Sequence, residues 1–562
     1  MQRQLIVHPL LFAAYVVLFA YTHNFEFAPS LGVLLVLLTI AMGGVAFLWG
    51  ALALLTHNAR RAAIAASVAL LLFVSYGHVK NLVTAWSWGF HVFSLQIGYI
   101  KMAVAICGVV AVLAAMWLKR ASSDSTVVAT TVLNRVGYAL VLLSLAHLLT
   151  VEVAARRESA TERQVHIDSA AVDGEPRNSE DRPDIYYIVL DAYGRSDILK
   201  ALYGYDNTPF IDWLTRKGFY VAQQSHSNYA QTMLSLASSL NLDYLDPVEM
   251  QSAAATAATD ARWRVDLTSA AVQLLNQAGE NARLPLAHLI QFNKVAATLK
   301  DNGYGFAAFT SGYGGVQFPN ADVVHRATML SDFEESIIQT TPIADLLDMA
   351  HDQRRELHRR RIRYIFDHVA DSADESAPRF VLAHILSPHS PFVFRADGTP
   401  PPATDENAFY DEEEFDPGNP ADRARIRNGY RGQIEYVTRQ IQLVLERLLA
   451  DSSRRRIIIL QADHGPSLTM DWSAPSRTAI DERMSILNAY WVPPDIRARL
   501  YPTITPVNTF RIILNRYFGG PAELLPDRSF FSTYDSPYAF SDVSAIASGS
   551  GSSNRSTSQD GH

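Results

Sequence analysis

The stretch Asp184-Ile-Tyr-Tyr-Ile-Val-Leu190 runs directly into Asp191. A second apolar run, Arg456-Ile-Ile-Ile-Leu-Gln-Ala462, runs directly into Asp463-His464-Gly465. Both runs have the length and the residue types of buried strands. Because ligands of an open parallel sheet collect outside the carboxyl ends of its strands, we expect the polar side chains after these two runs to meet around a divalent cation.

Two further apolar runs, Gly305–Phe309 and Phe380–Ile385, also have strand character. Helical patterns such as Ala287–Lys300 and Ile426–Leu449 lie between the strand-like runs. This alternation predicts an α/β domain over residues 183–544 with a doubly wound, mostly parallel sheet. The Ser/Gly-rich residues 545–562 indicate a disordered tail.

The first 155 residues are far more apolar than the rest of the chain. We interpret residues 1–155 as an α-helical membrane domain with five transmembrane helices, because this region holds five long apolar runs. The runs cover about Leu5–Tyr21, Leu31–Leu55, Ala62–Tyr76, Ile97–Leu118 and Val136–Val153. The polar residues 156–182 indicate a linker to the α/β domain.

The charges of the loops predict the orientation in the membrane. The connection His57–Arg61 is basic, as is the loop from Lys119 to Arg135, whereas His23–Ser30 has no Lys or Arg. The positive-inside rule therefore places the N-terminus and both basic loops in the cytoplasm, and residues 156–562 outside the cytoplasmic (inner) membrane. The aromatic connection Gly77–Ser94 is either a lipid-facing surface or a belt that anchors the helices.

Composition excludes several classes of partner and site. The formal net charge of -8 argues against binding to nucleic acid, which calls for a basic surface. Cys107 is the single cysteine, so neither a disulfide framework nor a cysteine-based metal site can form within one chain.

Thr232 is the candidate nucleophile. It opens an expected helix, Thr232–Leu240, and a helix N-terminus favours an anion such as phosphate. A threonine hydroxyl is a weak nucleophile unless it is activated, for example by a metal ion. The alternative is that Thr232 only caps the helix, just as Asp191 alone would be an ordinary turn residue at the end of a strand.

The order and spacing of these motifs resemble the alkaline phosphatase-like superfamily, which includes the sulfatases. Over residues 183–520 the pattern is most similar to the membrane-anchored branch with a threonine nucleophile, namely lipoteichoic acid synthases and lipid A phosphoethanolamine transferases. The resemblance implies one or two divalent ions (zinc, manganese or magnesium) with the ligands Asp191, Thr232, Asp463 and His464. It also implies that His389 contacts the transferred phosphate or protonates the leaving group.

The chain departs from the superfamily patterns at two places. Sulfatases carry a Cys or Ser in a Cys/Ser-x-Pro-x-Arg motif, but this sequence reads Thr232-Met-Leu-Ser-Leu236, which disfavours sulfate ester hydrolysis. Many relatives have Glu after the Gly of the Asp-His-Gly motif, where this chain has Pro466.

Three further residues are candidates for substrate binding. Asn228 precedes the nucleophile and either orients the substrate or belongs to a turn. Arg477, like Arg483, follows the Asp463 motif and could pair with an anionic headgroup. His384 lies in a strand-like run, so it is either a substrate contact or a structural histidine.

Together these features predict a metal-dependent membrane phosphotransferase. It would move a phosphorylated headgroup from a phospholipid onto an envelope glycan or lipid through a phospho-Thr232 intermediate. One alternative is a phosphodiesterase, phosphatase or sulfatase-like hydrolase of the same fold. A second is a non-catalytic lipid sensor, which would be expected to have lost metal ligands.

The topology can be tested with a reporter that is active only in the cytoplasm. Fused after residue 562, the reporter should give no signal, because five transmembrane helices would place that end outside. The same reporter inserted in the basic loop after Arg60 should be active. A strong cytoplasmic signal from the C-terminal fusion would contradict the five-helix arrangement.

Overall fold

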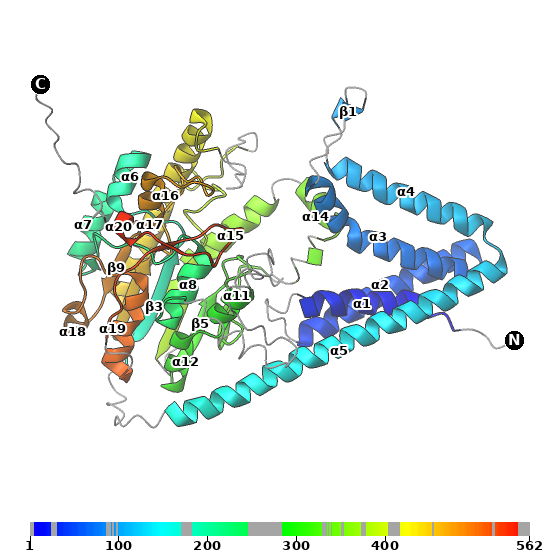
Figure 1. The fold of residues 1–562 in the computed structure, drawn as a ribbon, viewed down its shortest axis with the longest axis horizontal. Coiled ribbons are helices and arrows are strands. Elements are labelled where there is room, and N and C mark those ends of the chain that lie inside the picture. The colour runs from blue at the N-terminus through cyan, green and yellow to red at the C-terminus, as the bar shows by residue number, and fades with distance from the viewer. Residues whose placement is uncertain are drawn as a thin grey trace, which may run out of the picture. The chain divides into compact units, whose positions relative to one another are not determined.

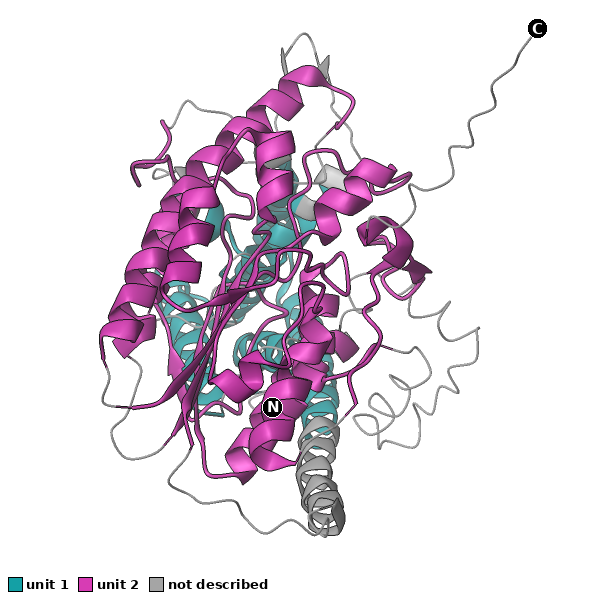
Figure 2. Cartoon of the chain, turned by 90° about the vertical axis from the view of Figure 1, so that its left-hand side faces the viewer, with its two compact units in different colours: residues 1–165, 330–353 teal, residues 166–329, 354–562 magenta. Residues whose placement is uncertain are grey.

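The computed structural model describes residues 5–23, 31–85, 91–92, 95–96, 99–169, 182–245, 284–328, 334, 337–338, 340–349, 353–371, 378–402, 416–451, 454–519 and 523–548. Two compact units divide the chain (Figure 2). Unit 1 consists of residues 1–165 and 330–353, and unit 2 of residues 166–329 and 354–562. The insertion of residues 330–353 into unit 1 differs from the sequence-based assignment of 183–544 to one continuous domain.

Unit 1 is built from long apolar helices. The helices are α1 (His8–His23), α2 (Leu31–Thr56), α3 (Ala59–Ala85), α4 (Tyr99–Arg120) and α5 (Ser123–Ser169), with the short strands β1 (His91–Val92) and β2 (Leu95–Gln96) between α3 and α4. By length and composition, four of the described helices could cross a membrane, namely α2 to α5, and the fifth is a shorter apolar helix over residues 8–22. Helix α5 continues through residues 156–169, where the sequence indicated a linker.

Polar contacts join the ends of helices within unit 1. Asn134 of α5 accepts hydrogen bonds from the backbone nitrogens of Val7 and His8 and donates one to the carbonyl of Leu5. These bonds supply partners for backbone groups at the start of α1 that the helix itself leaves without any. Asn134 therefore fixes α1 against α5.

The segment inserted from residues 330–353 packs on α3. Helix α14 (Pro342–Met349) carries Asp345, which accepts a hydrogen bond from the Tyr76 hydroxyl and forms an ion pair with Lys80 at 2.6 Å. The carbonyl of Thr340 accepts a hydrogen bond from the backbone nitrogen of Gly77. These polar contacts join residues that are far apart in the sequence and place this segment in unit 1. No local sequence pattern predicts them.

Unit 2 contains a seven-stranded sheet of order β4-β9-β8-β3-β7-β5-β6 (Figure 1). Its strands are β3 (Asp184–Leu190), β4 (Tyr220–Val221), β5 (Gly305–Phe309), β6 (Val323–His325), β7 (Arg379–Ile385), β8 (Arg456–Gln461) and β9 (Asn488–Trp491). The strands β8, β3, β7, β5 and β6 are parallel, while β9 pairs antiparallel with both β8 and β4. The expected α/β class with a mostly parallel sheet is confirmed.

Helices cover both faces of the sheet, so side chains of β3 alternate between two cores. Ile185, Tyr187 and Val189 belong to one core, whereas Tyr186 and Ile188 belong to the other. The first core is completed by α8 (Thr232–Asn241), α11 (Leu284–Gln291), α12 (Lys294–Asp301) and α19 (Pro506–Phe518). The second is completed by α6 (Ser196–Tyr203), α7 (Thr208–Arg216), α15 (Gln353–His368) and α16 (Pro420–Ala450). Burial on both faces explains why the strands are almost continuously apolar.

The end of unit 2 is more ordered than the composition indicated. The elements after β9 include α18 (Pro494–Arg497), β10 (Phe530–Phe531), β11 (Ser541–Asp542) and α20 (Ser544–Ala547). Ala547 is buried in a small apolar cluster with Met484 and Phe531, and this burial stabilises residues that the sequence assigned to the tail. Residues 549–562 lie outside the described part of the chain.

One expected helix, Ala287–Lys300, is divided into α11 and α12. Asn293 separates them, because its side-chain oxygen accepts a hydrogen bond from the Ala296 nitrogen at 2.8 Å while its amide donates to the Ile290 carbonyl. This is the N-cap arrangement, in which a side chain replaces the missing helical partner.

Replacing Asn293 with Ala should lower the free energy of unfolding by about 1 kcal/mol, the usual cost of losing an N-cap. The measurement is denaturant unfolding of the full chain in detergent, followed by a signal specific to the α/β unit. The control is Lys294→Ala, an exposed position one residue further on, which should change stability little. Equal stability of the Asn293 variant and the wild type would contradict the capping role.

Candidate active site

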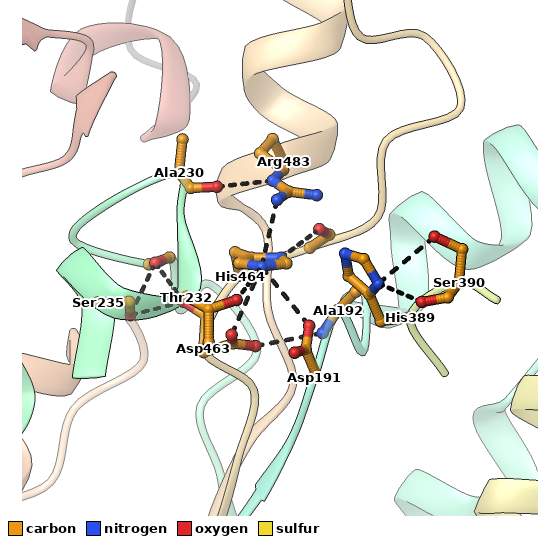
Figure 3. Close-up of polar contacts among 12 residues, drawn as sticks. Asp191, Ala192, Ala230, Thr232, Ser235, His389, Ser390, Asp463, His464 and Arg483 are labelled. Atoms are coloured by element: carbon orange, nitrogen blue, oxygen red, sulfur yellow. Dashed lines mark hydrogen bonds and ion pairs between the residues drawn. The ribbon is translucent and has the colours of Figure 1, made fainter. Parts of the chain in front are cut away.

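The candidate active site lies at the carboxyl ends of three neighbouring strands. Asp191 follows β3, Asp463 and His464 follow β8, and His389 follows β7. Figure 3 shows their side chains converging, with Thr232 at the start of α8 on one side. Parallel strands end at the same edge of a sheet, so the meeting expected from the sequence occurs.

A strained turn directs Asp191 toward Asp463. Ala192, the next residue, has a φ of 62°, which is a left-handed conformation that alanine seldom adopts. Its nitrogen donates to Asp463 Oδ1 at 3.2 Å, and its carbonyl accepts from the Tyr430 hydroxyl at 2.8 Å. Strain held in place by its surroundings in this way is common at functional sites.

His464 has one nitrogen fixed by the backbone and the other directed at the site. Nδ1 lies 2.9 Å from the Gly465 carbonyl, which can only accept, so Nδ1 carries the proton. Nε2 lies 3.0 Å from Thr232 Oγ1 and 3.2 Å from the guanidinium of Arg483. Because Arg483 can only donate, Nε2 is the unprotonated nitrogen of the ring, and it is the atom with which His464 could bind a metal.

Gly465 is required by the close approach of the main chain. A Cβ atom at this position would overlap the backbone carbonyls of Glu482 and Ser485, at the end of α17 (Arg477–Met484). The Gly465 nitrogen donates to the Arg483 carbonyl at 2.7 Å, which holds the turn against α17. The glycine of the motif thus serves close packing rather than an unusual φ.

Two serines, one before α8 and one within it, hold this part of the chain to the end of β8. The hydroxyls of Ser227 and Ser235 both donate to the backbone carbonyl of Asp463, at 2.5 and 2.7 Å. Thr232 is the first residue of α8, Gln231 is its N-cap, and the Thr232 hydroxyl contacts His464 instead of the backbone. The interpretation of Thr232 as a simple cap is therefore wrong.

The donor set fits a divalent cation. Both carboxylate oxygens of Asp191 and Oδ2 of Asp463 are buried and have no hydrogen-bond partner within the described residues. Side chains in reach of a common point are Asp191, His389 and His464, and also Asp191, His384 and Asp463. Buried carboxylates without partners are costly, and a cation between them removes that cost. Oxygen ligands with imidazole suit zinc, manganese or magnesium.

The electrostatics of the site favour this ligand set. Burial alone would raise the pKa of Asp191, but the charge of His389, with His384 close by, outweighs it and holds the pKa below its ordinary value. Burial, followed by the charge of Arg483, lowers the pKa of His464. The carboxylate is thus ionised and the imidazole neutral, the protonation states in which each binds metal.

The turn that carries His389 is held by α16. His389 Nδ1 lies 2.6 Å from the Ser390 carbonyl, so this nitrogen is the donor, and the other ring nitrogen is on the side of His464 (Figure 3). Gln433 of α16 donates to the His389 carbonyl at 2.7 Å and accepts from the Val393 nitrogen at 2.8 Å. Gln433 therefore positions the histidine, although no sequence signal marked it.

The three residues expected to bind substrate lie in different environments. His384 is fully buried, and its Nε2 lies 3.2 Å from Asp191, so it orients that carboxylate. Asn228 is also buried, accepts a hydrogen bond from the Val507 nitrogen at the start of α19 and donates one to the Arg528 carbonyl, so its amide is engaged within the protein. Arg477 is exposed at the start of α17, and the arginine that reaches the site is Arg483.

Arg483 is the largest completely buried side chain among the residues that the structure describes. Its Nε donates to the Ala230 carbonyl at 2.7 Å, and its guanidinium lies over the Trp472 ring. These contacts hold a permanent positive charge beside His464 and Thr232. From the sequence, Arg477 and Arg483 were equal candidates for pairing with an anionic headgroup. The packing of α17 buries Arg483 beside His464 and leaves Arg477 exposed.

The chain is similar to one protein family and to several solved structures. Residues 183–484 match the family described as Sulfatase. The C-terminal periplasmic domain of EcEptC from Escherichia coli is 12% identical with a TM-score of 0.41, covering 66% of this chain and 94% of that chain. Lipooligosaccharide phosphoethanolamine transferase A from Neisseria meningitidis, an integral membrane protein, is 14% identical with a TM-score of 0.35, covering 91% and 94%. The search of curated proteins gave no match.

Asp463→Asn should lower the divalent metal content of the purified protein, because it removes a negative charge from the ligand set while leaving the volume unchanged. His464→Ala should do the same. Metal content is measured by elemental analysis after gel filtration. Asp481→Asn on α17, outside the ligand cluster, is the control and should keep wild-type metal. Full metal content in both site variants would show that the motif is structural.

Proposed function

The chain belongs to the Sulfatase family and is a sulfatase-like hydrolase or transferase, and from this premise we propose that it is a metal-dependent membrane phosphotransferase. It takes a phosphorylated headgroup from a phospholipid onto Thr232 and passes it to a glycan or lipid of the cell envelope. The metal ligands in this proposal are Asp191, Thr232, Asp463 and His464.

The observation that carries the proposal is the position of the Thr232 hydroxyl. It lies 3.0 Å from His464 Nε2, beside the carboxylates of Asp191 and Asp463 and at the N-terminus of α8. A hydroxyl in this place is poised for attack on an anion whose oxygens face the helix N-terminus.

The residues divide the work of the transfer. A divalent cation held by the four ligands would add positive charge at the Thr232 oxygen and the phosphoryl oxygens. Arg483 adds a fixed positive charge beside His464, and His389 stands next to Asp191 where it can give a proton to the leaving oxygen. Phosphoryl transfer needs little more than such positioning and charge stabilisation.

The membrane part of the proposal rests on the helices of unit 1. Four are long and apolar enough to cross a bilayer, the shorter apolar helix α1 is the fifth crossing in this proposal, and the loop charges favour a cytoplasmic N-terminus. In this proposal the chain spans the inner membrane several times, and unit 2 works outside the cytoplasm, where a phospholipid donor and an envelope acceptor are at hand.

Two alternatives to a transferase are a hydrolase that uses the same site and a non-catalytic lipid sensor. Attack by water on phospho-Thr232 would make the same machinery a phosphodiesterase or phosphatase. A non-catalytic sensor would be expected to lack ligands, whereas Asp191, Asp463 and His464 are gathered with their metal-binding atoms close together. The absence of the Cys/Ser-x-Pro-x-Arg motif at Thr232 keeps sulfate esters disfavoured.

Thr232→Ala should abolish turnover, because a chemical step without its nucleophile slows by orders of magnitude. The protein should stay folded, since the hydroxyl bonds to His464 and caps nothing. Thr232→Ser keeps the hydroxyl and should retain measurable activity. In wild type, rapid denaturation during turnover should leave a phosphate-containing mass increment on the peptide with residue 232. Near-normal turnover by the alanine variant would mean that water attacks phosphorus directly.

A further inference from the structure

A small, shallow pocket that is partly open to solvent lies beside His389. Its walls are largely apolar and include no carboxylate, lysine or arginine. The residues that matter here are Ala192, His389, Phe392, Ile426, Tyr430 and Pro466.

The pocket is on the side of the site away from the nucleophile. In Figure 3, Thr232 lies on one side of Asp191 and His464, while Ala192, His389 and Ser390 lie on the other. In phosphoryl transfer the attacking and leaving oxygens are roughly in line through phosphorus. A phosphate attacked by Thr232 therefore directs its leaving group toward His389 and the pocket.

Helix α16 forms the wall that sets the pocket's width. Ile426 and Tyr430 line it, and between them Gly429 faces the Phe392 ring, because a Cβ at Gly429 would overlap that ring. The Tyr430 hydroxyl is engaged with the Ala192 carbonyl, so this wall is fixed to the turn after Asp191. Phe392 has no room to retreat further toward α16.

We infer that this pocket holds the carbon skeleton of the alcohol that leaves phosphorus, and that Gly429 determines how wide that alcohol can be. The inference rests on the proposed function, since it takes Thr232 as the nucleophile. Apolar walls without an ion partner select an uncharged alcohol. The acceptor alcohol of the second step would enter by the same route, because it attacks phospho-Thr232 from the side that the first alcohol has left.

The bonds and protons of the first step balance. A bond forms between Thr232 Oγ and phosphorus, and the bond between phosphorus and the alcohol oxygen breaks. The departing oxygen takes a proton from His389, and the hydroxyl proton of Thr232 passes to solvent. In the second step His389 takes a proton from the acceptor alcohol, and the Thr232 oxygen is released and protonated.

The test compares Gly429→Ala with Gly432→Ala in the full-length protein. Both glycines lie inside α16, so both substitutions raise helix propensity alike, but a Cβ at Gly432 meets its nearest neighbour at an ordinary 3.5 Å. The probes are ethyl 4-nitrophenyl phosphate and ethyl 4-methylumbelliferyl phosphate, which share the retained group and differ in the width of the leaving group. Phenyl 4-nitrophenyl phosphate changes the retained group instead.

In Gly429→Ala, kcat/KM for the wider leaving group should fall at least about tenfold more than for the narrower one, because the displaced Phe392 ring narrows the pocket. Gly432→Ala should behave as wild type. Adding Phe392→Leu to Gly429→Ala should restore kcat/KM for the probe with the wider leaving group. Such a recovery would show that the loss in the single variant does not come from misfolding. Thermal unfolding of each variant is followed alongside.

Equal losses for both leaving groups, or selectivity that follows the retained group, would overturn the assignment of the pocket. If Thr232 in the wild type becomes phosphorylated by the probes while Gly429→Ala does not discriminate between the two leaving groups, the assignment of the pocket is wrong and the proposed function stands. If wild type turns over none of the probes and Thr232 is never labelled, the proposed function falls, and this inference falls with it.

Discussion

Two buried carboxylates at the ends of adjacent strands are the constraint on which the site depends. Asp191 and Asp463 are almost completely inaccessible, and three of their four oxygens have no hydrogen-bond partner in the part of the chain that the structure describes. Like charges at this depth repel each other strongly unless positive charge lies between or beside them. His384 and His464 contact Asp191 and supply part of that compensation, and a divalent cation would supply the rest.

The surrounding architecture holds these groups in place against their repulsion. Ala192 accepts a strained conformation, Gly465 permits contact with α17, and the serines before and within α8 bind the Asp463 carbonyl. Each contact is made by the main chain or directed to it, so together they fix the backbone that carries the candidate ligands. A site whose ligands are fixed beforehand loses little free energy to reorganisation when the substrate's charge changes.

The same arrangement gives the site two distinct sides. Thr232 and α8 present a hydroxyl and a helix N-terminus, whereas β7 and α16 present His389 and an apolar pocket. Gln433 and Tyr430 of α16 bind the two turns that carry His389 and Asp191. One helix therefore supports both the group beside the leaving oxygen and the wall that faces the leaving alcohol.

The sequence by itself determined the strands β3, β5, β7 and β8, the alternation of strands and helices, and the candidate ligands that follow β3 and β8, because these depend on short-range periodicity and on the residues just after a strand. It indicated the apolar helices for the same reason. Only the tertiary structure decided that Arg483 and not Arg477 reaches His464, that Asn228 serves α19, and that residues 330–353 pack on α3. It also revealed Gln433 and the division of residues 287–300 at Asn293. Most of these contacts join residues tens to hundreds of positions apart, so they form only once the chain is folded. Arg477 and Arg483 lie on the same short helix and differ in the direction that each side chain faces, which also depends on how that helix packs.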